Sequence, residues 1–256
     1  MSFFSSIFGK HSAAPERPSV ADGDRVYAIG DIHGRSDLLD RLFLQIIEDQ
    51  AERPPATTRL IFLGDYVDRG PSSRQVIEKL MALGDGENDI TFLMGNHEEM
   101  LLAALDGDMR ALSMLDRLGG TETFLSYGIE RERYERATGP ERLALAREAV
   151  PEDHRIWIRD LADAYTNGNY LFVHAGIRPG VPLDQQSPSD LRWIRREFLD
   201  HKNQHEMFVV HGHSISTEID ERPNRLGIDT GAFQSGILTA VGLETDRRWF
   251  IQAHAD

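Results

Sequence analysis

Five short polar clusters follow apolar, strand-like runs in this sequence of 256 residues. Each cluster offers oxygen or nitrogen ligands for a metal ion at the point where a buried strand would end. Carboxylates, an amide and imidazoles that converge on one sheet edge could hold two divalent cations side by side, an arrangement that hydrolyses phosphate esters. The clusters are, in chain order, Gly30-Asp31-Ile32-His33-Gly34, Gly64-Asp65-Tyr66-Val67-Asp68-Arg69-Gly70, Gly95-Asn96-His97-Glu98, His174-Ala175-Gly176 and His211-Gly212-His213.

Six residues in these clusters are candidate metal ligands. Asp31 and His33 are two positions apart just after a predicted strand, so both can turn toward one point. Asp65 is the candidate to bridge two cations, because a carboxylate has two oxygens. The other candidates offer an amide oxygen or imidazole nitrogens, and they are Asn96, His174 and His213. Oxygen and nitrogen ligands without sulfur suit two manganese ions, with iron, zinc or cobalt as alternatives.

The same clusters supply groups for catalysis. Two close cations would lower the pKa of a shared water, and the bridging hydroxide would attack phosphorus in line. Arg69 and Arg195 are the candidate phosphate-binding residues, since a guanidinium grips phosphate through two parallel hydrogen bonds. His97 can protonate the leaving oxygen, and Asp68 can orient its imidazole. Considered alone, Arg69 could equally form an ion pair on the surface, and Arg195 could lie on a solvated face of a helix. Together the residues predict a dinuclear metal-dependent phosphomonoester hydrolase.

The composition narrows the class of protein further. Apolar residues are 40% of the chain and charged residues 27%, which is ordinary for a globular protein with a substantial core. The formal net charge of -14 disfavours nucleic acid as a partner. The absence of cysteine excludes thiolate metal sites and cysteine nucleophiles, and it fits a cytoplasmic location. No apolar run approaches the roughly 20 residues that cross a bilayer, so no stable membrane insertion is expected.

The spacing of apolar residues predicts strands and helices in alternation over the first hundred residues. Strands are predicted over 26–29, 60–63 and 90–94, each ending at a cluster, with helices beginning near Ser36 and Pro71 between them. This order implies mostly parallel, buried strands between helices. Later strands are predicted over 170–173, 208–210, 226–229, 237–243 and 249–253. The last three of these are close in sequence, which suggests an antiparallel meander.

The chain is predicted to be a single domain over residues 25–256 behind a flexible N-terminal tail, residues 1–24. The first ten residues fit either a mobile terminus or a short amphipathic anchor. Residues 99–164 are mostly helical in pattern and rich in arginine and glutamate. They fit either a helical cap beside the site or a plain layer of surface helices. The sequence makes no prediction of oligomeric state.

The clusters resemble the signature of the phosphoprotein phosphatase (PPP) family of metallophosphoesterases, of the bacterial type. The matching segments are Asp31-x-His33-Gly34, Gly64-Asp65-x-Val67-Asp68-Arg69-Gly70 and Gly95-Asn96-His97-Glu98, and the resemblance continues through His174 and Gly212-His213. It implies an α/β fold, the calcineurin-like αββα sandwich, with the site on loops at the sheet edges. It implies the same six metal ligands, the same acid pair and the same two arginines. Alignment of the motifs makes His211 a strand-end residue rather than a ligand.

Three functions are weighed. The expected one is a Ser/Thr protein phosphatase acting on phosphorylated proteins, because Glu98 resembles that branch and dinucleotide hydrolases usually carry aspartate there. The alternative is a diadenosine tetraphosphate hydrolase or another hydrolase of small phosphate esters, for which Tyr127, Tyr134 and Trp157 are available to hold a base. A binding module that retains only the fold would lack a ligand, whereas every motif position here is filled.

Overall fold

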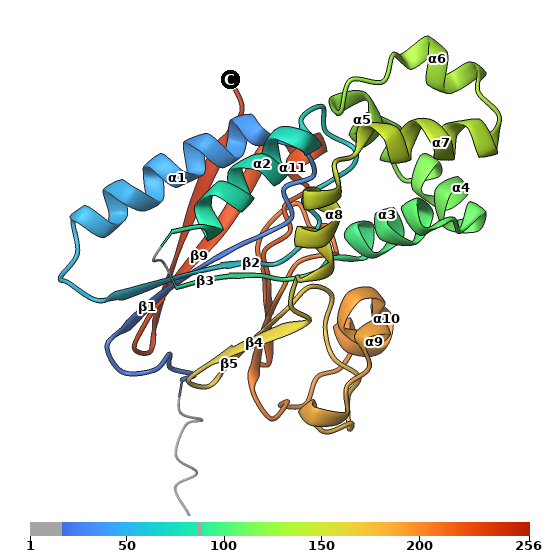
Figure 1. Ribbon diagram of the computed structural model, residues 1–256. Coiled ribbons are helices and arrows are strands. Elements are labelled where there is room, and N and C mark those ends of the chain that lie inside the picture. The colour runs from blue at the N-terminus through green and yellow to red at the C-terminus, as the bar shows by residue number, and fades with distance from the viewer. Residues whose placement is uncertain (1–16, 87–88) are drawn as a thin grey trace, which may run out of the picture.

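Two five-stranded sheets form the centre of the molecule, and the computed structural model describes residues 17–86 and 89–256 (Figure 1). The strands of the first sheet are β1 (Asp24–Ile29), β2 (Thr57–Phe62), β3 (Asp89–Phe92), β9 (Ile237–Glu244) and β10 (Arg247–His254). Their order is β10-β9-β1-β2-β3. β1, β2 and β3 run parallel, whereas β9 is antiparallel to both of its neighbours.

The second sheet is also mixed. Its strands are β4 (Ala164–Asn167), β5 (Tyr170–Val173), β6 (Phe208–His211), β7 (Asp220–Glu221) and β8 (Arg225–Gly227). Their order is β4-β5-β6-β8-β7, with β5, β6 and β8 parallel and the two edge strands antiparallel to their neighbours. Each sheet therefore has three adjacent parallel strands whose carboxyl ends meet at one edge.

Alternation along the strands divides the apolar core between the faces of the sheets. Val26 and Ala28 of β1 pack in one cluster with Phe172 and Val210 of the second sheet, so this cluster lies between the sheets. Tyr27 and the neighbouring odd-numbered positions point to the other face, which helices cover.

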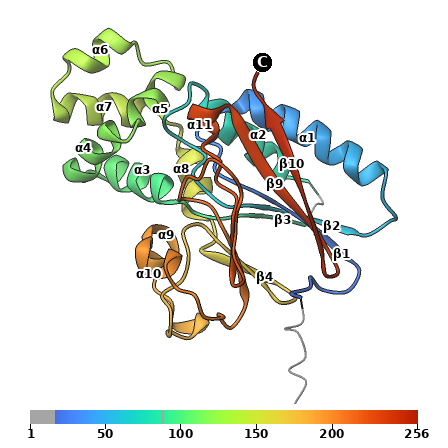
Figure 2. The ribbon, with the colours of Figure 1, turned by 180° about the vertical axis from the view of Figure 1, so that it is seen from behind.

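Helices cover both outer faces (Figures 1 and 2). On the first sheet lie α1 (Ser36–Ala51) and α2 (Ser73–Gly84), whose buried sides join the helix-side core, and the short α11 (Ala232–Ser235). On the second sheet lie η1 (Leu183–Gln185), α9 (Pro188–Trp193) and α10 (Arg196–Leu199). The layers confirm the predicted α/β fold, an αββα sandwich.

Six helices separate β3 from β4, and Figure 1 shows most of them gathered at one end of the sheets. They are α3 (Asn96–Asp106), α4 (Met109–Arg117), α5 (Gly120–Ser126), α6 (Arg131–Arg136), α7 (Gly139–Ala149) and α8 (Glu152–Arg159). α3 packs against α4, α7 and α8, while α5 packs against α2. The mostly helical pattern predicted for residues 99–164 is confirmed.

The predicted antiparallel meander is wrong in its first strand. β9 and β10 form a hairpin, but β8 belongs to the second sheet, where it pairs with β6 and β7. Between β8 and β9 the chain crosses from one sheet to the other through Gly231, whose φ of 68° is a left-handed conformation. Spacing along the sequence cannot distinguish such a crossing from a tight turn.

The N-terminal part of the described chain contacts the fold before β1 begins. Val20 is buried, and its backbone N–H donates to the carbonyl of Thr245 at 3.0 Å. The possible amphipathic anchor lies outside the described residues. None of the helices in the described ranges combines the length and apolarity needed to cross a membrane.

Candidate metal centre

Loops at the carboxyl ends of the central strands bring the predicted site residues together. Asp31 and His33 follow β1, Asp65 to Arg69 follow β2, and Asn96 opens α3 just after β3. The second sheet contributes His174 after β5 and His213 after β6. All six candidate ligands are buried, with exposed fractions of 6% or less. Polar side chains from segments far apart in the sequence are thus buried together at one site.

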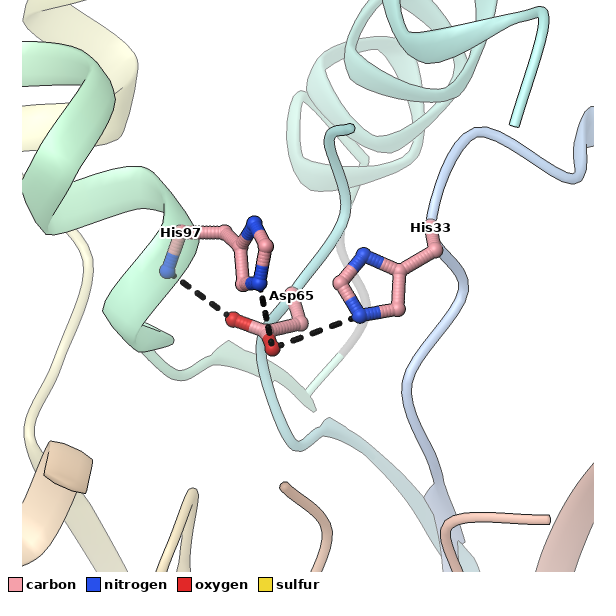
Figure 3. A group of neighbouring side chains, drawn as sticks. All are labelled: His33, Asp65 and His97. Carbon is pink, nitrogen blue, oxygen red and sulfur yellow. Dashed lines mark hydrogen bonds and ion pairs between the residues drawn. The ribbon is translucent and has the colours of Figure 1, made fainter. Parts of the chain in front are cut away.

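One group of possible ligands consists of His33, Asp65 and His97, and Figure 3 shows the two imidazoles turned toward the carboxylate between them. Asp65 Oδ2 lies 3.4 Å from His33 Nε2 and 3.9 Å from His97 Nε2. One possible ligand atom from each residue lies within 4.8 Å of the others, so the three are close enough to bind one metal ion together.

A second group shares the same carboxylate and consists of Asp65, His174 and His213. Asp65 Oδ1 lies 3.4 Å from His174 Nε2, and this nitrogen lies 3.2 Å from His213 Nδ1. Asn96 Oδ1 is 3.0 Å from the same His174 nitrogen. The two oxygens of Asp65 therefore face two different sets of imidazoles.

Backbone carbonyls orient two of the imidazoles. His33 Nδ1 lies 2.7 Å from the Val67 carbonyl, and His174 Nδ1 lies 2.8 Å from the Leu63 carbonyl. In each ring Nδ1–H donates to the carbonyl, which leaves the lone pair of Nε2 facing Asp65. Burial lowers the pKa of both rings below the usual histidine value, so both remain neutral. Neutral imidazoles held in this way are the form that binds metals.

Acidic groups are unusually concentrated beside these rings. Burial, the Asp229 carboxylate and Asp65 raise the pKa of Asp31 well above its ordinary value. Burial raises the pKa of Asp65 as well, but the surrounding imidazoles outweigh it and the net shift is downward. Among the described residues, Asp229 Oδ2 and His213 Nε2 are buried without a hydrogen-bond partner. Several buried carboxylates beside neutral imidazoles fit a pair of divalent cations, because cations would compensate the negative charge.

Asp31 belongs to neither compact group. Its oxygens accept the backbone N–H of His213 at 3.0 and 3.2 Å. An added Cβ at Gly212 would lie 2.0 Å from Asp31 Oδ1, so only glycine permits this close approach. Asp31 thus lies against the His213 loop, on the side of Asp229.

The predicted acid pair is in direct contact. His97 Nδ1 lies 2.6 Å from Asp68 Oδ2, and both residues are buried. Burial lowers the pKa of His97, but the carboxylates of Asp65 and Asp68 raise it more, so the net shift is upward. Asp68 therefore favours the protonated imidazole that an acid needs.

The two predicted phosphate-binding arginines differ in setting. Arg69 places Nη1 2.9 Å from His33 Nε2 and Nη2 3.1 Å from His97 Nε2, and its guanidinium lies 4.7 Å from the ring centre of Phe233. Arg195 is exposed, and its Nη2 donates to the His213 carbonyl at 3.3 Å. Both arginines border the centre, but only Arg69 lies within the group of imidazoles.

Backbone strain is concentrated at the centre. Among the described residues six non-glycine positions have positive φ, and five of them belong to the clusters: His33, Asp65, Asp68, Arg69 and His213. Each left-handed residue of this kind costs on the order of 1–3 kcal/mol and persists only where surrounding contacts enforce it. The fold therefore holds these side chains in orientations that relaxed loops would not adopt.

Glu98 is a buried residue whose role the sequence did not reveal. Its carboxylate accepts backbone N–H groups from Asp65 and Tyr66 at 2.8 Å, Gly95 at 3.0 Å and Val67 at 3.2 Å. Burial, followed by the nearby Asp65, raises the pKa of Glu98 to about 8. Glu98 shapes the loop after β2, so its identity carries no direct information about the substrate. A glutamate three positions after the residue preceding a helix is a capping pattern, and that signal could have found it.

Asp229 and Phe233 are further residues of the centre that were not predicted. Asp229 follows β8 and is 3% exposed, and Phe233 packs edge-on to His33 with ring centres 5.6 Å apart. The position of Asp229 at a strand end was a signal that could have found it. His211, in contrast, turns away from both groups: its Nε2 lies 3.2 Å from Arg225 Nη1.

Comparison with known proteins agrees with this geometry. The calcineurin-like phosphoesterase family matches residues 24–231, and the chain belongs to this family. By family it is therefore a metallophosphoesterase.

Individual relatives cover the chain to different extents. A symmetrical bis(5'-nucleosyl)-tetraphosphatase of Methylococcus capsulatus is 32% identical over 60% of this chain and 44% of its own length. A zinc-dependent endopolyphosphatase of Saccharomyces cerevisiae is 23% identical over 89% of this chain and 78% of its own. A solved structure of a candidate diadenosine tetraphosphatase has a TM-score of 0.64 at 20% identity, covering 94% of this chain and all of that one. The chain spans about half the length of the tetraphosphatases that it matches.

Proposed function

We propose that this protein is a dinuclear metal-dependent phosphohydrolase whose substrates are dinucleotide polyphosphates such as diadenosine tetraphosphate. The observation that carries the proposal is the division of the Asp65 carboxylate between two sets of imidazoles, with His33 and His97 on one side and His174 on the other. A shared carboxylate of this kind suits two cations a few ångströms apart.

The ligands that we assign are the six predicted from the sequence: Asp31, His33, Asp65, Asn96, His174 and His213. Manganese fits this oxygen and nitrogen donor set, and iron, zinc and cobalt fit it too. When bound, two such cations would activate a water molecule and offset negative charge on the phosphoryl group.

The chain's own residues would handle phosphate and proton. Arg69, placed between His33 and His97, can donate two hydrogen bonds to phosphoryl oxygens, and Arg195 can add a further contact from the edge. His97, oriented by Asp68, can give its Nε2 proton to the leaving oxygen. In the described structure Arg69 Nη2 donates to the same Nε2 at 3.1 Å. Nε2 can therefore carry the acid proton only once Arg69 has turned from it to a phosphoryl oxygen.

The relatives favour a dinucleotide polyphosphate over the phosphoprotein expected from Glu98. Several curated relatives are named symmetrical bis(5'-nucleosyl)-tetraphosphatases, and another is named an endopolyphosphatase, so both names refer to chains of phosphates. Glu98 no longer argues for a protein phosphatase, since all four of its hydrogen bonds are to backbone N–H groups.

A substrate comparison tests the proposal. Purified protein with added Mn²⁺ is given diadenosine tetraphosphate, a phosphoserine peptide and an aryl phosphate, and the kcat/KM values are compared. We expect the dinucleotide to be the best substrate and ADP to be its main product. A clear preference for the phosphopeptide would reject the dinucleotide assignment, and no turnover of any of the three would reject the phosphohydrolase. Asp65→Asn, prepared in parallel, controls for contaminating phosphatases.

A further inference from the structure

The helical segment between β3 and β4 reaches the acid pair through one buried hydroxyl. Thr123 lies in α5 and is fully buried. Its Oγ1 donates to Asp68 Oδ1 at 2.6 Å and accepts the backbone N–H of Asp68 at 2.8 Å. Because Asp68 Oδ2 is the oxygen that contacts His97 Nδ1, Thr123 holds the opposite oxygen of the same carboxylate. Thr123, Asp68 and His97 are thus linked in series, and each oxygen of the Asp68 carboxylate has its own hydrogen-bond partner.

The contact with Thr123 matters because the backbone of Asp68 is in a strained conformation. Asp68 and Arg69 are consecutive left-handed residues, with φ of 72° and 69°. Such residues persist only when neighbouring groups satisfy their backbone. Ser73 Oγ, 3.1 Å from Thr123 Oγ1, also accepts the Asp68 N–H at 3.0 Å. Two hydroxyls on two helices thus enforce the turn that presents Asp68 to His97.

The neighbours of Thr123 contact the next residues of the same loop. Gly119, at the start of α5, accepts the backbone N–H of Arg69 at 3.0 Å. Its φ is 103°, and an added Cβ would lie 2.9 Å from Arg69 Cγ, so the position requires glycine. Ser126 Oγ, at the end of α5, accepts the Arg74 N–H at 3.0 Å in the first turn of α2. The stretch from Gly119 to Ser126 therefore contacts the loop after β2 at two points and the first turn of α2 at a third.

We propose that Thr123 is a positioning residue for the reaction: its hydroxyl fixes the Asp68 carboxylate so that Asp68 orients His97 toward the leaving oxygen. The inference rests on the proposed function, because it takes His97 to be the acid. It makes the helical segment over 99–164 part of the catalytic apparatus.

Three variants test the role. Thr123→Val keeps the shape and removes the hydroxyl, and Thr123→Ser restores the hydroxyl without the methyl group. Thr121→Val is the matched control: Thr121 is half-buried in the same helix, and its hydroxyl makes no hydrogen bond to any residue in the described part of the chain. Rates are measured with Mn²⁺ on aryl phosphates of good and poor leaving groups, together with bound metal and Tm.

We expect Thr123→Val to keep its metals and to lose about 10–100-fold in kcat with poor leaving groups, the usual effect of removing a group that orients a functional side chain. The loss should be much smaller with good leaving groups, and Thr123→Ser should recover most of the rate. Thr121→Val should match wild type. Equal losses on all leaving groups, or no recovery in Thr123→Ser, would reduce Thr123 to a packing residue and overturn the inference.

A second measurement is independent of turnover. In metal-free protein, the His97 Nδ1–H proton shared with Asp68 should give a downfield NMR resonance, assigned by its loss in His97→Asn. It should shift or broaden in Thr123→Val and return in Thr123→Ser. A resonance unchanged in Thr123→Val would overturn the inference. If wild type hydrolyses no phosphate ester, the proposed function fails, and the resonance still decides whether Thr123 orients the pair.

Discussion

The two sides of the candidate metal centre are held in different ways. On the His33 and His97 side, the left-handed pair Asp68 and Arg69 is fixed by contacts from α5 and α2, and Arg69 is bound to both imidazoles. On the His174 and His213 side, Arg195 is exposed and reaches the centre through one 3.3 Å hydrogen bond. A cavity of about 490 Å³ that Trp193 and Arg195 help to line opens beside it.

The difference suggests a division of labour. Side chains that are fixed before substrate arrives lose little freedom on binding, so the first side is suited to phosphoryl recognition and proton transfer. The second side has room for the rest of a substrate. Changes on the first side should therefore affect the chemical step, whereas changes on the second side should affect mainly the choice of substrate.

Removing the carboxylate that both sides of the centre share, that of Asp65, should affect the two sides equally. Asp65→Asn keeps the side-chain shape and tolerates the left-handed backbone, but it removes the charge that faces both imidazole groups. We expect bound metal to fall below two ions per chain, with near-complete loss of activity. Metal analysis and kinetics on one preparation measure both. Asp106→Asn, an exposed surface position, is the control. Two metals retained in Asp65→Asn would contradict the assignment of a bridging ligand.

Removing the acid should affect only the first side. His97→Ala should keep its metals and lose about 10²–10⁴-fold in kcat with poor leaving groups, since general acid catalysis contributes that much. Aryl phosphates of graded leaving-group pKa measure the effect. A loss of equal size across the series would show that His97 is not the acid, and a loss of metal would make it a ligand.

The arginines offer the most direct contrast between the sides. Arg69→Ala should weaken competitive inhibition by inorganic phosphate about 10–100-fold, the value of one or two charge-assisted hydrogen bonds. Arg195→Ala should weaken it by no more than about fivefold, because exposed charged contacts contribute little. Arg69→Lys should not restore the wild-type value, since an ammonium cannot span His33 and His97 in the fork geometry of a guanidinium. If Arg69→Ala and Arg195→Ala weakened phosphate inhibition equally, the two sides of the centre would not differ in phosphate binding.

Glu98 should affect stability more than specificity. The shorter side chain of Glu98→Asp cannot reach all four of its backbone N–H partners, and each buried group left without a partner costs about 1–3 kcal/mol. We expect a lower Tm in thermal unfolding. The ratio of kcat/KM for diadenosine tetraphosphate and a phosphopeptide should not change, and a change in that ratio would restore Glu98 as a marker of substrate class.

Much of this structure could be read from the sequence because local signals were strong. The strands before Asp31, Asp65 and Asn96 were found from their apolar runs. The polar residues that follow them lie at one edge of the sheet, although Asp31 lies against the His213 loop and outside the two compact groups. The contacts that could not be predicted depend on distant segments. Thr123 lies 55 positions from Asp68, and nothing in its own surroundings marks it as a partner of the acid pair. The pairing of β8 with β6 was missed for the same reason.

The central claim is that Asp65 joins two metal ions, and anomalous diffraction from crystals grown with Mn²⁺ tests it most directly. Two peaks are expected, one beside His33 and one between His174 and His213, each in contact with a different oxygen of Asp65. A single peak, or a pair of peaks that Asp65 does not connect, would contradict the account.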